Sequence, residues 1–303
     1  MKKTLLTTAT AVATVMSASA AYADLSLGGA LARSIQSGDG TKGLSNSSTS
    51  STITVNYTTT LDNGMGMAAN TVILPNAITA SNAGANGAVR YLLTVSSDLG
   101  SFYLGSQMGS AMDDMDGTQG AGSYNAGGRI LSAAAEGYSD GDTATGNGFG
   151  ISTNLAGAAV KVTMGDNGPT GQDDERTLSM AASYNLMGAT IKAGNTDYGT
   201  AAKDDSFYSV GYSVGGFDLG WNLYDSGTTE MVQIGASTTV AGLSVGVSSA
   251  STSEEAGTTD QDAMGIHVGG SLGGAFWNVD YINSDDGAGT EVDKYRIVFG
   301  VGF

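Results

Sequence analysis

The sequence contains no cysteine and only two prolines among its 303 residues. The lack of cysteine excludes a disulfide framework, so hydrogen-bonded secondary structure must stabilise the chain. The scarcity of proline suits long strand ladders, which proline would interrupt. Beyond the N-terminal segment, no stretch is apolar enough for a membrane-spanning helix. If the chain crosses a membrane, it must do so as a closed β-barrel, because lipid cannot satisfy open strand edges.

Basic residues and histidine are also scarce. The chain has 12 Lys and Arg against 29 Asp and Glu, for a formal net charge of −17, and one histidine, His267. This balance disfavours nucleic-acid binding and favours the attraction of cations. A single histidine cannot supply a zinc site, and the sequence places no Ser and Asp partners beside it for hydrolysis. We therefore expect no enzyme and no resident cofactor, and no nucleic-acid partner.

The N-terminal 23 residues have the organisation of a secretory signal peptide. Lys2 and Lys3 precede an apolar stretch of small residues from Leu5 to Met16, and Ala21-Tyr22-Ala23 forms an A-x-A cleavage pattern before Asp24. Several threonines interrupt the apolar stretch, which is too short to span a membrane. We expect residues 1–23 to be removed on export and residues 24–303 to form one domain.

The C-terminal end alternates strictly between two kinds of side chain. Tyr295, Ile297, Phe299, Val301 and Phe303 share one parity, and the chain stops on an aromatic residue. A strand directs alternate side chains to opposite faces, so one face here is wholly apolar. This ending resembles the terminal strand of Gram-negative outer-membrane proteins. The resemblance implies that the strand ending at Phe303 is recognised by the barrel-assembly machinery and that the protein lies in the outer membrane.

Alternation of this kind recurs along the whole chain, and it predicts an all-β antiparallel barrel of about sixteen strands. The predicted strands are 25–36, 51–60, 65–74, 88–97, 101–109, 147–154, 158–165, 176–186, 189–197, 206–214, 217–224, 229–239, 243–250, 261–271, 274–283 and 293–303. Short turns rich in Gly and Asn alternate with long polar loops, the first of them at 37–50 and the longest at 110–146. Short periplasmic turns and long outer loops are typical of outer-membrane barrels.

The mature chain as a whole resembles the general porins of Gram-negative bacteria, especially the alphaproteobacterial kind. The features that match are Ala21-Tyr22-Ala23, the turn Leu61-Asp62-Asn63-Gly64, the strand-to-loop layout around 101–146 and the ending at Phe303. The resemblance implies a trimeric barrel of sixteen strands whose third long loop, 110–146, folds into the lumen and narrows it. Such a barrel would let small hydrophilic solutes and ions diffuse across the outer membrane, surrounded by lipid and lipopolysaccharide.

Loop 110–146 carries a concentration of carboxylates. These residues are Asp113, Asp114, Asp116, Glu136, Asp140 and Asp142. Carboxylates in a narrow water-filled lumen concentrate cations and repel anions, so they predict weak cation selectivity. The alternative is a solvated acidic loop tip. Asp113, Asp114 and Asp116 are close enough together to share a Ca²⁺ ion, although solvated surface charge is the favoured explanation.

Basic residues at lumen-facing positions are predicted on the opposite wall. Parity selects Arg90, Lys161, Lys192 and Arg296, and it places the acids Asp218 and Asp280 on the same inner surface. Acidic loop and basic wall together would set a transverse field across the lumen. Each base has an alternative role as the partner of a neighbouring carboxylate.

Three other interpretations stay open at the sequence level. A plugged or structural barrel, such as an adhesin, would conduct no ions. An outer-membrane hydrolase would depend on His267. A soluble secreted sandwich or β-solenoid would require polar side chains in its interior and an exposed aromatic end, which the physics of a water-soluble fold disfavours.

Overall fold

The computed structural model describes residues 24–38, 41–74, 89–106, 111–112, 148–166, 176–197, 204–225, 229–254, 261–285 and 291–302. These residues form sixteen β-strands. The strands are β1 (Asp24–Gly38), β2 (Thr41–Thr60), β3 (Gly66–Ile73), β4 (Val89–Ser97), β5 (Gly100–Gly105), β6 (Gly148–Leu155), β7 (Ala158–Asp166), β8 (Arg176–Leu186), β9 (Ala189–Asp197), β10 (Asp204–Val214), β11 (Phe217–Asp225), β12 (Thr229–Val240), β13 (Leu243–Glu254), β14 (Gln261–Leu272), β15 (Ala275–Asp285) and β16 (Glu291–Gly302).

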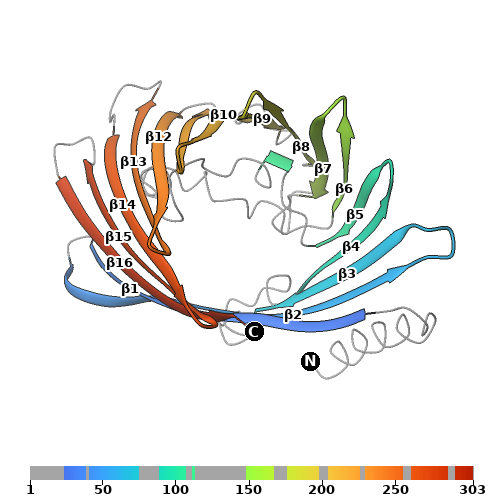
Figure 1. Cartoon of the computed structure of the whole chain (residues 1–303), viewed down its shortest axis with the longest axis horizontal. Helices are drawn as coiled ribbons and strands as arrows, with labels where there is room; N and C mark the ends of the chain where they lie inside the picture. The colour runs from blue at the N-terminus through green and yellow to red at the C-terminus, as the bar shows by residue number, and fades with distance from the viewer. Residues whose placement is uncertain are drawn as a thin grey trace.

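Each strand pairs antiparallel with its neighbours in the sequence, and β1 pairs with β16, so the sheet closes into a barrel (Figure 1). The closing register runs from Ala30 opposite Gly302 to Ser37 opposite Tyr295. The predicted all-β antiparallel barrel of sixteen strands is therefore confirmed. Phe303 itself, like the signal segment 1–23, lies outside the described residues.

Tight two-residue turns connect the strands at one end of the barrel. Ala156 and Gly157, Met187 and Gly188, and Ala241 and Gly242 all adopt positive φ, the glycines between 82° and 87°. Positive φ at both central residues defines the type I′ turn, whose twist matches that of the flanking strands. These turns fix the registers of their hairpins, because the residues on either side must face each other.

The first hairpin differs from the prediction. Residues 37–50 were expected to form a loop, but β1 continues to Gly38 and β2 already begins at Thr41, with Gly38 opposite Thr41. Register shifts follow Ser34 and Gln36, so the pairing is irregular there. The Ser- and Thr-rich sequence lacks apolar alternation, which is the signal that the strand prediction used.

The outer surface of the barrel is apolar. Along the strands, large hydrophobic side chains at every second position are exposed on the outside, among them Leu27 (68%), Met264 (65%) and Phe299 (60%). Exposure of this kind is costly in water and favourable in lipid. Among the described residues, no helix has the length and hydropathy needed to cross a membrane.

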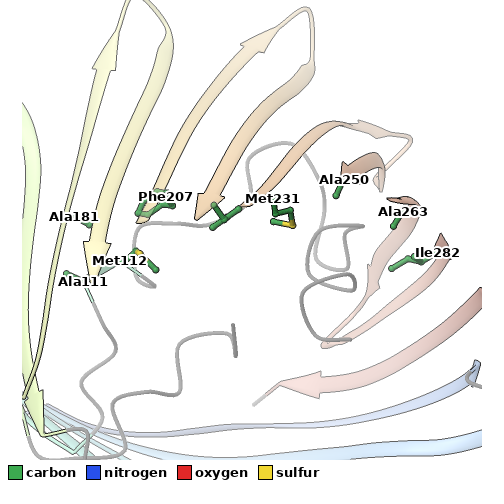
Figure 2. Packing of buried hydrophobic residues seen from close by; sticks show 9 residues of the cluster. Ala111, Met112, Ala181, Phe207, Met231, Ala250, Ala263 and Ile282 are labelled. Carbon is green, nitrogen blue, oxygen red and sulfur yellow. The ribbon is translucent and has the colours of Figure 1, made fainter. Parts of the chain in front are cut away.

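A cluster of buried hydrophobic side chains lies on the inner surface. The buried hydrophobic cluster contains Ala111, Met112, Ala181, Phe207, Tyr224, Met231, Ala250, Ala263 and Ile282. Figure 2 shows these side chains on the lumen side of strands that follow one another around the wall, with Ala111 and Met112 beside Ala181. Part of the inner wall is thus packed rather than open to water.

Candidate functional site

The inner wall is the candidate site because the strands direct most of their polar side chains there. On β10, Asp205 and Ser209 are buried on the inside, whereas Tyr208 and Val210 are exposed on the outside. On β15, Asp280 is buried inside and Val279 is exposed outside. A polar interior within an apolar exterior is the reverse of a water-soluble barrel, and it defines a transmembrane barrel with a hydrophilic lumen.

Three charged or titratable side chains meet on the inner surface of β14, β15 and β16. His267 lies directly opposite Asp280, and Asp280 lies directly opposite Arg296. His267 Nδ1 is 2.5 Å from Asp280 Oδ1. Arg296 donates to Asp280 Oδ2 from Nε at 3.1 Å, and its Nη2 lies 3.0 Å from the same oxygen. We call these three residues the Asp280 cluster.

The Asp280 cluster is largely closed to solvent. The Asp280 side chain has no exposed surface, that of His267 is 5% exposed and that of Arg296 is 24% exposed. A buried carboxylate is costly unless its oxygens are paired, and both oxygens of Asp280 have partners here. The positive charge of Arg296 and the negative charge of Asp280 therefore cancel locally. Of the two alternatives for Arg296, the structure places it as the partner of a neighbouring carboxylate.

Lys161, Lys192 and Arg90 also lie at inward-facing positions. Lys161 Nζ is 5.0 Å from the centre of the Tyr103 ring, a cation–π arrangement across β5 to β7, and Tyr103 Oη shares a 2.8 Å hydrogen bond with Ser152 Oγ. Lys192 pairs in register with Ser183 and Ser209, and Arg90 with Val72. Their contribution to a field across the lumen stays a prediction.

Asp218 occupies the same cross-strand row as the Asp280 cluster. The row runs from Asp218 through Ser237 and Gly246 to His267. Asp218 is exposed and accepts a 2.5 Å hydrogen bond from Ser213 Oγ. Its inward parity and its exposure together make it a carboxylate that water and ions in the lumen can reach.

The start of the long loop is fixed to the inner wall. Ala111 and Met112 form part of a helical turn, which lies inside the ring of strands (Figure 1). The Ala111 amide donates to Thr163 Oγ1 at 2.8 Å, and the Met112 amide donates to Ser179 Oγ at 3.0 Å. Both residues are buried, at 0% and 2% exposure. Hydrogen bonds from two consecutive amides to β7 and β8 hold the chain against the wall immediately before Asp113.

Sequence reasoning missed the apolar part of the inner wall. Phe207, Tyr224 and Met231 are directly opposite one another on β10, β11 and β12, and the Phe207 and Tyr224 rings stack with centroids 6.3 Å apart. The available signal was that these segments carry apolar residues at both parities. Lumen-facing apolar residues need cover from water, which indicates that other groups pack on this wall.

Next to that apolar row, two residues away along each strand, lies a row of buried polar side chains. Ser209, Asn222 and Gln233 are opposite one another and between 0% and 1% exposed. Within the described part of the chain, Ser209 Oγ and both polar atoms of the Asn222 amide have no hydrogen-bond partner. Buried polar groups are nearly always paired in proteins, so this panel of the wall is expected to bind water or another polar group.

The predicted constriction residues lie outside the described residues. These are Asp113, Asp114, Asp116, Glu136, Asp140 and Asp142. The suggested Ca²⁺ position at the first three of them is therefore also outside the description. Among the residues that the structure describes, no group of three or more His, Cys, Asp or Glu side chains could hold a metal ion.

The fold and the polar lumen define a transmembrane β-barrel of the channel-forming type. A sequence profile described as Gram-negative porin matches residues 8–224, which is more than half of the chain. The chain therefore belongs to the Gram-negative porin family. No curated protein sequence matches it.

Several solved structures share the fold. The anion-selective porin from Comamonas acidovorans is 16% identical, with a TM-score of 0.67 over 93% of this chain and 100% of that chain. OmpT from Vibrio cholerae, folded in vitro and in a trimer form, is 14% identical, with a TM-score of 0.65 over 93% and 100%. A mutant of the Rh. blastica porin is 19% identical, with a TM-score of 0.62 over 91% and 100%. At these identities the likeness concerns the fold.

Proposed function

We propose that this protein is a passive diffusion channel for small hydrophilic solutes and ions in the bacterial outer membrane, and that it catalyses no reaction. The observation that carries the proposal is the closed barrel of sixteen strands with an apolar outside and polar residues inside. Barrels of about this size leave an aqueous passage, whereas barrels of about eight strands are filled by their own side chains. Membership of the porin family supports the same conclusion.

We further propose that the loop 110–146 narrows the passage. The support comes from Ala111 and Met112, whose amides bind the inner wall and so start the segment inside the barrel. The buried apolar row of Phe207, Tyr224 and Met231 provides a wall that needs cover. A connection as long as residues 110–146 is uncommon in a compact domain unless it has a function.

We propose a weak preference for cations. The chain carries a net charge of −17, and six carboxylates fall between Asp113 and Asp142. Because Asp280 neutralises Arg296, the basic wall has one effective positive charge fewer than its sequence suggests. The fold does not fix the sign of selectivity, since the related Comamonas barrel is anion-selective. The charges of this chain must therefore decide it.

We propose a homotrimer, exported after cleavage of residues 1–23, assembled by the barrel-assembly machinery through the strand ending at Phe303 and surrounded by lipid and lipopolysaccharide. The trimer form of the Vibrio cholerae relative supports the oligomeric state. No resident cofactor is proposed as necessary for diffusion, and Ca²⁺ binding at Asp113, Asp114 and Asp116 stays a prediction.

Conductance of the refolded mature protein in a planar bilayer tests the proposal. Stepwise currents in groups of three, with a reversal potential of cationic sign under a salt gradient, are expected. Neutralising the acidic segment (Asp113→Asn, Asp114→Asn and Asp116→Asn) should lower the cation preference. The matched control removes three charges from another loop (Asp173→Asn, Asp174→Asn and Glu175→Gln) and should change it less. A folded, inserted protein that passes no current would refute the channel, and equal effects of the two triple variants would refute the constriction.

A further inference from the structure

We propose that His267 determines the ion selectivity of the channel as a function of pH: its protonation changes the net charge of the Asp280 cluster from zero to plus one and thereby weakens the preference for cations. This inference rests on the proposed channel function and adds a specificity-determining residue to it.

The geometry allows the charge to change without a change of structure. Asp280 Oδ2 accepts a hydrogen bond from Arg296 Nε, and Asp280 Oδ1 accepts one from His267 Nδ1. A neutral imidazole that donates from Nδ1 carries no proton on Nε2. Nε2 can then take up a proton while the bond to Asp280 remains in place. Because Arg296 and Asp280 cancel, the charge of the cluster equals the charge of His267.

Among the described residues, the inward neighbours of His267 on β13, β14, β15 and β16 include no second histidine and no cysteine. Its inward neighbours on β13 and β14 are Gly246, Ser248, Gly265 and Gly269, all uncharged. On β15 the facing charged group is Asp280, and on β16 it is Arg296. Lys294, whose backbone pairs with Ile282, is the next base along β16, and a lysine keeps its charge throughout the range in question. Asp218 lies in the same row at a distance of three strand spacings, about 14 Å.

The composition limits the groups that ordinarily change charge near neutral pH, which also include the α-amino group of Asp24 once residues 1–23 are cleaved. The chain contains one histidine and no cysteine. Histidine is the side chain that ordinarily titrates between about pH 5 and 8, whereas ordinary carboxylates titrate near pH 4 and lysines above 10. A change of selectivity between about pH 7.5 and 5.5 is therefore assigned to His267 by its loss in the His267 variants.

The size of the effect follows from Coulomb's law. A unit charge about 10 Å from the path of an ion changes the energies of monovalent cations and anions in opposite directions. With screening at an ionic strength of about 0.1 M, the ratio of cation to anion permeability should fall by roughly twofold on protonation. A factor of that size is well resolved in a reversal potential.

The experiment measures reversal potentials of the refolded mature protein in planar bilayers under a KCl gradient at about pH 7.5 and 5.5, the interval in which histidine titrates. Wild type should show the roughly twofold fall. His267→Asn, which places an amide donor where Nδ1 lies, should give the same ratio at both pH values, and so should His267→Gln. Asp218→Asn is the matched control, because it removes a charge from the same row but leaves His267 intact. The Asp218→Asn variant should have a lower ratio of cation to anion permeability at both pH values. Its ratio should still fall when the pH is lowered, as in wild type.

Two results would overturn the inference. A wild-type ratio that does not depend on pH would show that His267 does not change charge in this interval, and this result needs no variant to fold. A step that persists in either folded His267 variant would assign it to another group. Folding is checked by heat-modifiable gel mobility. Both results presuppose open channels, so they differ from failure of the channel proposal, in which the folded protein passes no current.

Discussion

The strongest stability prediction concerns Asp280→Asn. The substitution keeps the shape of the side chain but removes the charge that balances Arg296 and binds His267. Removing one partner of a fully buried pair costs about 3–5 kcal/mol, and hydrogen bonds to charged groups contribute about 1.5–3 kcal/mol each. Arg296 is 24% exposed and can recover part of its hydration from the lumen. We therefore expect the free energy of unfolding to fall by about 2–4 kcal/mol.

Urea unfolding of the protein in lipid vesicles measures this change through the emission of Trp221 and Trp277, which lie at outward-facing positions on β11 and β15. The matched variant is Asp218→Asn, since Asp218 is exposed and should matter much less. In the double variant Asp280→Asn with Arg296→Gln, the unpaired cation is gone, so the loss should be smaller than the sum of the single losses. Equal stability of the Asp280 and Asp218 variants would refute the view that Asp280 is a paired buried charge.

Three further predictions test other parts of the structure. Ile266→Lys places a cation on the lipid-facing side of β14 and should cost about 2–4 kcal/mol of unfolding free energy in vesicles, whereas Ser237→Lys on the inside should cost much less. Gly300→Ala would push a methyl group into the Phe276 ring and should lower the free energy of unfolding by about 1–3 kcal/mol. The double variant with Phe276→Ala should recover part of this loss. Gly165→Ala should have little effect, because the space beside Gly165 is open. The double variant Thr163→Val with Ser179→Ala removes the acceptors of the Ala111 and Met112 amides, and each lost hydrogen bond should cost about 1 kcal/mol. This variant should have a higher single-channel conductance. Ser183→Ala, on the same inner face, should not change the conductance.

Much of the barrel could be predicted from the sequence because lipid imposes a strict rule on one face of every strand. The predicted strands 176–186 and 189–197 coincide with β8 and β9, where Met187 and Gly188 supply the tight turn between two alternating segments. The same rule gave no information about 37–50, because that sequence is rich in polar residues and lacks apolar alternation. Prediction succeeded where apolar residues alternate along the sequence and failed where they do not.

The inner wall could be predicted only in part, because water in a lumen tolerates many side chains. Parity placed Arg296 and Asp280 on the inside correctly. It could not predict that Phe207, Tyr224 and Met231 form a covered apolar row, since packing on the lumen side depends on what enters the barrel. Nor could it decide between a field role and an ion-pair role for Arg296, because that choice depends on a register between strands.

The strand register explains which contacts of the Asp280 cluster could be predicted from the sequence. The tight turn at Gly273 and Gly274 places Leu272 opposite Ala275, and counting back five residues on each strand places His267 opposite Asp280. The contact between Asp280 and Arg296 depends instead on the hairpin from Asp285 to Glu291, whose longer connection allows more than one register. A slip of one residue there would turn Arg296 toward the lipid, at a cost of about 2–4 kcal/mol near the middle of the membrane. The lipid-facing alternation of β16 and the Asp280–Arg296 pair thus favour the same register. Because that pair has no net charge, the charge of the Asp280 cluster depends on His267 alone.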